Sequence, residues 1–268
     1  MEMTGPYPHG TPSWVDLTTT DVAAASAFYA ALFGWEIDDG GGELGGYTMC
    51  RLRGRDVAAL SPMPAEQQAA GLPSTWNTYI TVDDTDAAVA RVGPAGGRVL
   101  SAPVDVMDLG RMAVIAEPSG AVVCLWQAGT HPGCRIVNEP GTLVWNELTT
   151  RAVDTAEAFY GAVLGWRFAD STELDTGGTY HVAQRPGDHA GVAGIMPMVG
   201  DRWPPGLPPQ WVVYFAVDDA DASAARAAEV GGTVHVPPTD IAVGRFSVIA
   251  DPAGAVFSVI RMAEGVAP

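Results

Sequence analysis

Residues Trp14–Trp35 read WVDLTTTDVAAASAFYAALFGW, and residues Trp145–Trp166 repeat the pattern as WNELTTRAVDTAEAFYGAVLGW. Each copy begins with the polar and apolar alternation of a strand and continues with apolar residues at helical spacing. In the first copy Asp21 stands where a helix N-cap is expected, and Gly34 stands where the helix should end. Both copies therefore predict a short strand followed directly by an amphipathic helix.

Each copy opens a longer repeat. After the first helix we expect a glycine-rich turn at Gly40–Gly46 and three strands, and a second round begins at Trp76 with a helix starting near Asp84. The second half follows the same order, with Trp211 in the place of Trp76. We therefore predict four βαβββ units of the α+β class. They form two tandem domains, 12–128 and 142–262, joined by a Pro- and Gly-containing linker, 129–141.

Composition excludes several classes of function. The net charge is −17, from 14 basic and 31 acidic residues, so nucleic acid and anionic membrane surfaces are repelled and are not expected as partners. All the basic residues are arginine, which excludes Schiff-base chemistry and a phosphate-loop lysine. The N-terminus lacks the pattern of a signal peptide, and the three cysteines fit no disulfide framework. We expect a cytoplasmic protein.

These motifs resemble the vicinal oxygen chelate superfamily, which has the glyoxalase, bleomycin-resistance and extradiol-dioxygenase fold. The resemblance rests on the Asp-capped helix with its Phe-Tyr pair, the Gly-Trp that ends it, and the turns at Glu117–Gly120 and Asp251–Gly254. The resemblance covers nearly the whole chain. Within the superfamily, the chain is similar to tandem-domain actinobacterial proteins labelled hydroxylase or glyoxalase-like. It implies that the mixed sheets curl into cups and that enzymatic members hold a divalent metal there.

The resemblance also implies where metal ligands should lie, namely near the start of each unit's first strand and on its last strand. The first-strand positions carried over are Trp14, Trp76, Trp145 and Trp211, and the last-strand positions are Cys124 and Ser258. An indole N–H only donates hydrogen bonds and cannot bind a metal. We therefore predict no metal and no cofactor at these positions.

Strand alternation places other side chains beside the tryptophans. If Trp14 points into a cup, so does Asp16, and if Trp145 does, so does Glu147. Met49 or Tyr47 in the first domain and Tyr180 or Val182 in the second are candidates to line the same cups. His181, beside Tyr180, is a candidate for the rim. A carboxylate beside indoles has a raised pKa, which suits a general acid or base.

Two functions stay open at this point. The first is metal-independent binding of a small apolar or aromatic molecule in a Trp-lined cup, as in sequestration or resistance. The second is a glyoxalase-like or hydroxylase-type enzyme (lyase, isomerase or oxygenation chemistry) that uses Asp16 and Glu147 or an unrecognised metal site. A third alternative is a structural or interaction protein whose cups are filled by these side chains and bind no ligand. In each case we expect a monomer that is a tandem pseudo-dimer, or a homodimer.

Overall fold

The computed structural model describes residues 1–38, 45–174, 177–201 and 203–266. Most of the glycine-rich turn expected at Gly40–Gly46 lies outside these residues. Within them, no helix is long and apolar enough to cross a membrane.

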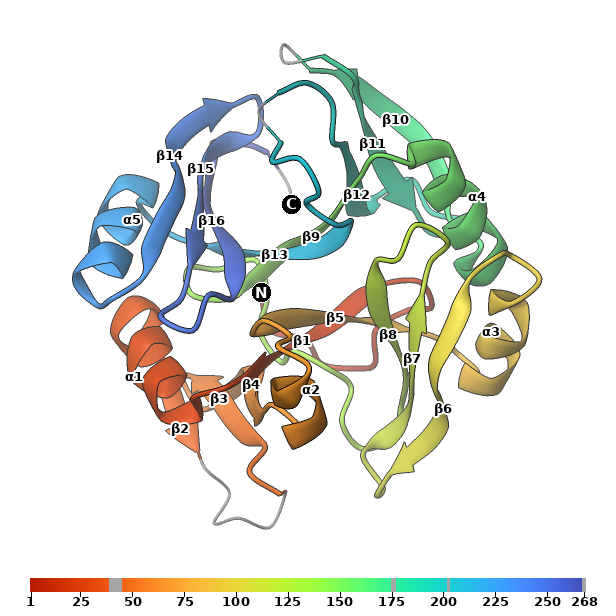
Figure 1. Cartoon of the computed structure of the whole chain (residues 1–268), viewed down its shortest axis with the longest axis horizontal. Coiled ribbons are helices and arrows are strands. Elements are labelled where there is room, and N and C mark those ends of the chain that lie inside the picture. Colours follow the sequence, from red (N-terminus) through yellow and green to blue (C-terminus); the bar gives the residue numbers. More distant parts are fainter. Residues whose placement is uncertain (39–44, 175–176, 202, 267–268) are drawn as a thin grey trace.

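In the described part of the first half, the chain forms one eight-stranded sheet and three helices (Figure 1). The strands are β1 (Pro12–Thr19), β2 (Glu36–Asp38), β3 (Thr48–Leu52), β4 (Arg55–Pro62), β5 (Thr75–Thr81), β6 (Arg98–Val106), β7 (Gly110–Ala116) and β8 (Val122–Ala128). The helices are α1 (Val22–Phe33), α2 (Ala65–Ala69) and α3 (Thr85–Val92). The strand order is β2-β3-β4-β1-β5-β8-β7-β6.

The second half repeats this architecture. Its strands are β9 (Leu143–Thr150), β10 (Arg167–Glu173), β11 (Thr179–Gln184), β12 (Gly191–Pro197), β13 (Gln210–Ala216), β14 (Thr233–Ile241), β15 (Gly244–Ala250) and β16 (Val256–Met262). Its helices are α4 (Val153–Leu164) and α5 (Ala220–Glu229), and the strand order is β10-β11-β12-β9-β13-β16-β15-β14. The predicted fold of tandem domains with mixed sheets is confirmed.

Each sheet joins two units that are consecutive in the chain. The first strands of the two units pair antiparallel, β1 with β5 and β9 with β13, and each first strand also pairs parallel with the last strand of its own unit. The units are therefore paired within each domain and are not exchanged between the domains.

The ends of α1 follow the chemistry read from the sequence. The Asp21 side chain accepts a hydrogen bond from the Ala24 backbone N–H, and Gly34 has φ 72°, a left-handed conformation that glycine adopts without strain. Helix α4 ends in the same way at Gly165, but its N-cap is Ala152, which makes no side-chain hydrogen bond. The two copies therefore begin their helices differently.

The two domains share their cores. Figure 1 shows α1 beside α5 and α3 beside α4, and aromatic residues of α1 pack against the second domain. Phe33 lies 5.1 Å from Phe215 between ring centroids, and Phe28 lies 6.2 Å from Phe257. On the other side the Arg91 guanidinium donates to the Val163 carbonyl oxygen. The helix-covered face of each sheet is thus buried against the other domain.

The segment 129–141 is packed rather than loose. The Cys134 side chain is buried, its backbone N–H donates to the Ser13 carbonyl oxygen, and its carbonyl oxygen accepts from the Tyr7 hydroxyl. Ile136 and Val137 join the same apolar core. All three cysteines of the chain are free and buried.

Candidate active site on the cup faces

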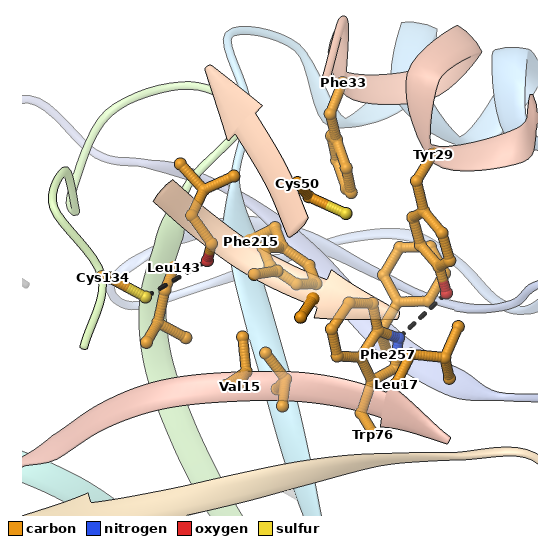
Figure 2. Packing of buried hydrophobic residues seen from close by; sticks show 14 of the residues in the cluster. Val15, Leu17, Tyr29, Phe33, Cys50, Trp76, Cys134, Leu143, Phe215 and Phe257 are labelled. Atoms are coloured by element: carbon orange, nitrogen blue, oxygen red, sulfur yellow. Dashed lines mark hydrogen bonds between the residues drawn. The ribbon is translucent and has the colours of Figure 1, made fainter. Parts of the chain in front are cut away.

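The side chains of β1 alternate between two faces of the first sheet. Val15 and Leu17 face α1 and the second domain (Figure 2), whereas Trp14 and Asp16 point to the opposite side. We call this opposite side, in each domain, the cup face. The register of β5 places Tyr79 beside Trp14 and Asn77 beside Asp16 on the first cup face.

A hydrogen-bonded network fills the centre of the first cup face. Asp16 accepts hydrogen bonds from the Tyr79 hydroxyl at 2.7 Å and from the Tyr47 hydroxyl at 3.1 Å. Its other oxygen accepts from the Asn77 amide at 2.8 Å. The Trp14 indole N–H donates to the Tyr47 hydroxyl oxygen at 2.9 Å. A chain of donors thus runs from the indole through a phenol to one buried carboxylate.

The second cup face repeats this network. The Trp145 indole N–H donates to the Tyr180 hydroxyl oxygen at 2.8 Å, and Tyr180 interacts in turn with the Glu147 carboxyl group. The Tyr214 hydroxyl donates to Glu147 at 2.9 Å. The Tyr180 ring lies directly over Gly194, where any Cβ would overlap the phenol oxygen. Glycine at this position therefore makes room for the tyrosine.

The last strands complete the two cup faces as the sequence indicated. Cys124 on β8 is in register with Tyr79, and Ser258 on β16 is in register with Tyr214. Residues paired in parallel strands share a face, so both lie beside the networks. The structure thus brings together most of the expected site: Trp14, Asp16, Tyr47 and Cys124 in one cup, and Trp145, Glu147, Tyr180 and Ser258 in the other.

The prediction that Trp76 and Trp211 face the cups is wrong. Trp76 points to the helix-covered face, where its indole N–H donates to the Tyr29 hydroxyl oxygen at 2.9 Å (Figure 2). Trp211 makes the matching bond to Tyr160 at 2.9 Å. Both are buried in the core between the domains.

Two other residues take the positions that those tryptophans were expected to hold. Trp14 lies seven residues before the N-cap Asp21, and the residue seven before the N-cap Asp84 is Asn77. The same count before Asp219 gives Val212 in the second domain. Counting back from the caps would have found these positions. The alignment on the tryptophans was one residue off, and a shift of one residue moves every side chain of a strand to the other face.

Burial governs the ionisation of the two carboxyl groups. It raises the pKa of Asp16, against the opposing effect of hydrogen bonds from Asn77, Tyr79 and Tyr47. It raises the pKa of Glu147 to about 7, with Tyr214 and Tyr180 opposing the rise. Burial and the adjacent carboxylates also raise the pKa of the tyrosines well above the usual value, so the phenols remain protonated: Tyr47, Tyr79, Tyr180 and Tyr214.

This set of residues does not fit the divalent metal that the fold implies. Such ions need several imidazole, carboxylate or thiolate ligands. Each cup instead directs protonated phenols toward one carboxyl group and an indole N–H toward one of these phenols, and burial raises the pKa of the Cys124 thiol. Among the described residues, no group of three or more His, Cys, Asp or Glu side chains could hold a metal ion.

Two histidines lie near these residues. His181 does not line the rim as expected, because its Nδ1 pairs with the Glu157 carboxylate of α4 at 2.6 Å on the helix-covered side. His131, from the segment between the domains, packs edge-on against Trp14 with ring centroids 4.5 Å apart. Burial lowers the pKa of His131. Sequence reasoning had no signal for this contact, which depends on the path of the 129–141 segment.

Comparisons with known proteins agree with the fold and with the two-domain arrangement. The family described as the Glyoxalase/Bleomycin resistance protein/Dioxygenase superfamily matches residues 11–125 and 142–259. A solved structure, the Mn(II)-bound glyoxalase from Novosphingobium aromaticivorans, superposes with a TM-score of 0.65 at 21% identity, covering 97% of this chain and 84% of that one. This last likeness concerns the fold alone.

Two curated relatives match along almost their whole length. "Putative glyoxylase CFP32" of Mycobacterium tuberculosis is 52% identical over 264 residues, covering 96% of this chain and 97% of the relative. "Anthracycline biosynthesis protein DnrV" of Streptomyces peucetius is 38% identical over 270 residues, covering 96% and 94%. The chain therefore belongs to the glyoxalase, bleomycin resistance protein and dioxygenase superfamily, as a member with two tandem domains.

Proposed function

We propose that the protein binds a small apolar or aromatic molecule on the cup face of at least one domain, without a metal, and so sequesters it. The observation that carries this proposal is the network of indole, phenol, carboxylate and phenol at the centre of both cup faces. Indole and phenol rings offer flat apolar surface, and the carboxylate offers one polar anchor. This is the usual composition of a small-molecule site.

The surroundings of the second network support an apolar ligand. Val212, Tyr214 and Ile260 form an apolar cluster with the half-buried side chains of Trp145, Phe246 and Met262. A relative named for anthracycline biosynthesis agrees with an aromatic compound, since anthracyclines contain fused aromatic rings.

The binding proposal is tested by fluorescence titration of the full-length protein with 1,8-dihydroxyanthraquinone. We expect saturable quenching of tryptophan fluorescence that is unchanged by a chelator. Free tryptophan at the same absorbance serves as the control for inner-filter effects. Quenching that rises linearly without saturation, in step with the control, would count against binding.

A second candidate function is acid–base catalysis by Glu147. The specific observation is its pKa of about 7, at which a carboxyl group can both give and take a proton near neutral pH. The relative with glyoxylase in its name is consistent with an enzyme. If a substrate is found, Glu147→Gln should abolish turnover while binding persists. Full turnover by a folded Glu147→Gln variant would exclude this role.

A further inference from the structure

The two cup faces share one network but differ in what surrounds it. We infer that the second cup is the ligand site, that the first is a closed structural copy, and that the ligand is a flat aromatic molecule with a phenol or quinone oxygen on one edge. This inference rests on the proposed function and assigns that function to one domain.

The first cup is closed by its own side chains. Both oxygens of Asp16 accept hydrogen bonds, from three donors in all. Trp14 is 3% exposed, with His131 packed edge-on against it. The rings of Trp126 and His131 lie 6.0 Å apart between centroids, and the Trp126 indole N–H donates to the His131 carbonyl oxygen. These contacts fix the segment around His131 in place. A ligand would have to displace these groups to reach Asp16.

The second cup lacks two of these closing groups. Val212 occupies the position of Asn77, so an isopropyl group replaces the amide that donates to Asp16. Ile260 occupies the position of Trp126, at the same distance along the last strand from Ser258 as Trp126 is from Cys124. Trp145 is half-buried, whereas the matching Trp14 is buried; Tyr180 and its counterpart Tyr47 are both half-buried. The indole face of Trp145 is thus more accessible than that of Trp14.

The polar part of the second cup identifies the edge of the ligand. Glu147 accepts a hydrogen bond from Tyr214 and interacts with Tyr180, and a carboxylate has further lone pairs with which to accept a phenol O–H. In its protonated form Glu147 has one O–H to donate, which suits a carbonyl oxygen. Val212 lies beside Glu147 on the neighbouring strand, and Ile260 belongs to the same apolar cluster, so the rest of the molecule should be an uncharged ring system.

The duplicated networks provide matched variants for the test. Full-length protein is titrated with 1,8-dihydroxyanthraquinone by calorimetry, with anthracene as the probe that lacks oxygen. We expect one site per chain and weaker binding of anthracene. Trp145→Phe and Val212→Asn should each weaken binding about tenfold, the change expected for one lost contact of about 1.4 kcal/mol. Trp14→Phe should leave the affinity unchanged, and circular dichroism verifies the fold of each variant.

Val212→Asn is the sharper variant, because it copies the third donor of the first cup into the second with little change in volume. Two sites per chain, or weakening by Trp14→Phe in place of Trp145→Phe and Val212→Asn, would overturn the assignment and leave the proposed function standing. If neither probe binds to the wild-type protein, both the assignment to the second cup and the proposed function are overturned.

Discussion

Asp16 and Glu147 occupy the same place in the two domains but have different neighbours. Asp16 has three hydrogen-bond donors, two phenols and one amide, whereas Glu147 faces two tyrosines and the apolar side chain of Val212. Fewer donors and an apolar neighbour disfavour the charged form of a carboxyl group. The side chain in the second domain is therefore the one that should change its protonation near neutral pH.

This difference predicts a pH-dependent stability. The pKa of Glu147 is about 7 in the folded protein and 4.5 in its ordinary state, so between these pH values the folded chain holds a proton that the unfolded chain has released. The free energy of unfolding therefore falls as the pH rises through this window. Glu147→Gln removes this loss, so the variant should gain up to about 3 kcal/mol over the wild type at pH 8 and little at pH 4.5.

Urea unfolding at the two pH values measures this gain, with Glu66→Gln on the exposed helix α2 as the control. A gain of equal size at both pH values would show that ionisation of Glu147 does not cause it.

At the scale of single elements, the strands show what sequence reasoning could and could not find. The alternation of β1 and β9 correctly placed Trp14 with Asp16 and Trp145 with Glu147 on one face. The same reasoning failed for β5, because Trp76 was aligned with Trp14 by residue type. The true match is Asn77, one residue later, and the period of two turns that single step into the opposite face.

The tyrosines that hold the carboxyl groups fall into two kinds. Tyr47 and Tyr180 could be proposed from the sequence because their strands follow the repeat. Tyr79 and Tyr214 were missed with the register of β5 and β13, since they lie on the face opposite to Trp76 and Trp211. Packing of His131 against Trp14 depends on tertiary structure, and no local pattern encodes it.

The capping of α1 gives a prediction for one element. Asp21 supplies an acceptor to the Ala24 N–H at 2.9 Å, which would otherwise lack a partner in the first turn. Asp21→Ala should lower the free energy of unfolding by about 1 kcal/mol. Chemical denaturation measures this loss, and Asp21→Asn, which keeps an acceptor, should lose much less. Equal losses in both variants would point to charge in place of capping.

At the scale of the whole molecule, the domains are joined through the faces that the helices cover. Trp76 donates to Tyr29, and the Tyr29 hydroxyl lies 3.2 Å from a carboxylate oxygen of Asp251 in the second domain. The core around them combines residues of both halves, including Phe215 and Phe257 (Figure 2). The repeat predicted two similar domains, but it carried no information about which faces they bury against each other.

This shared core predicts cooperative unfolding. Trp76→Phe removes the indole N–H donor and leaves a cavity at the junction, so it should cost about 2 kcal/mol. Calorimetry should show one transition for the wild type and the variant, since each half lends core to the other. Trp211→Phe, its counterpart in the second domain, should behave alike. Two separate transitions in the wild type would contradict a shared core.

Each cup, where the family resemblance implies a divalent metal, holds a buried carboxyl group that accepts hydrogen bonds from tyrosine. The most direct test is metal analysis by mass spectrometry of untagged protein that has been incubated with Mn²⁺, Fe²⁺, Ni²⁺ and Zn²⁺ and then desalted. We expect no stoichiometric metal, and no change when Tyr47 or Tyr180 is replaced by phenylalanine. One or two tightly held ions per chain, lost on substitution of Asp16 or Glu147, would contradict it.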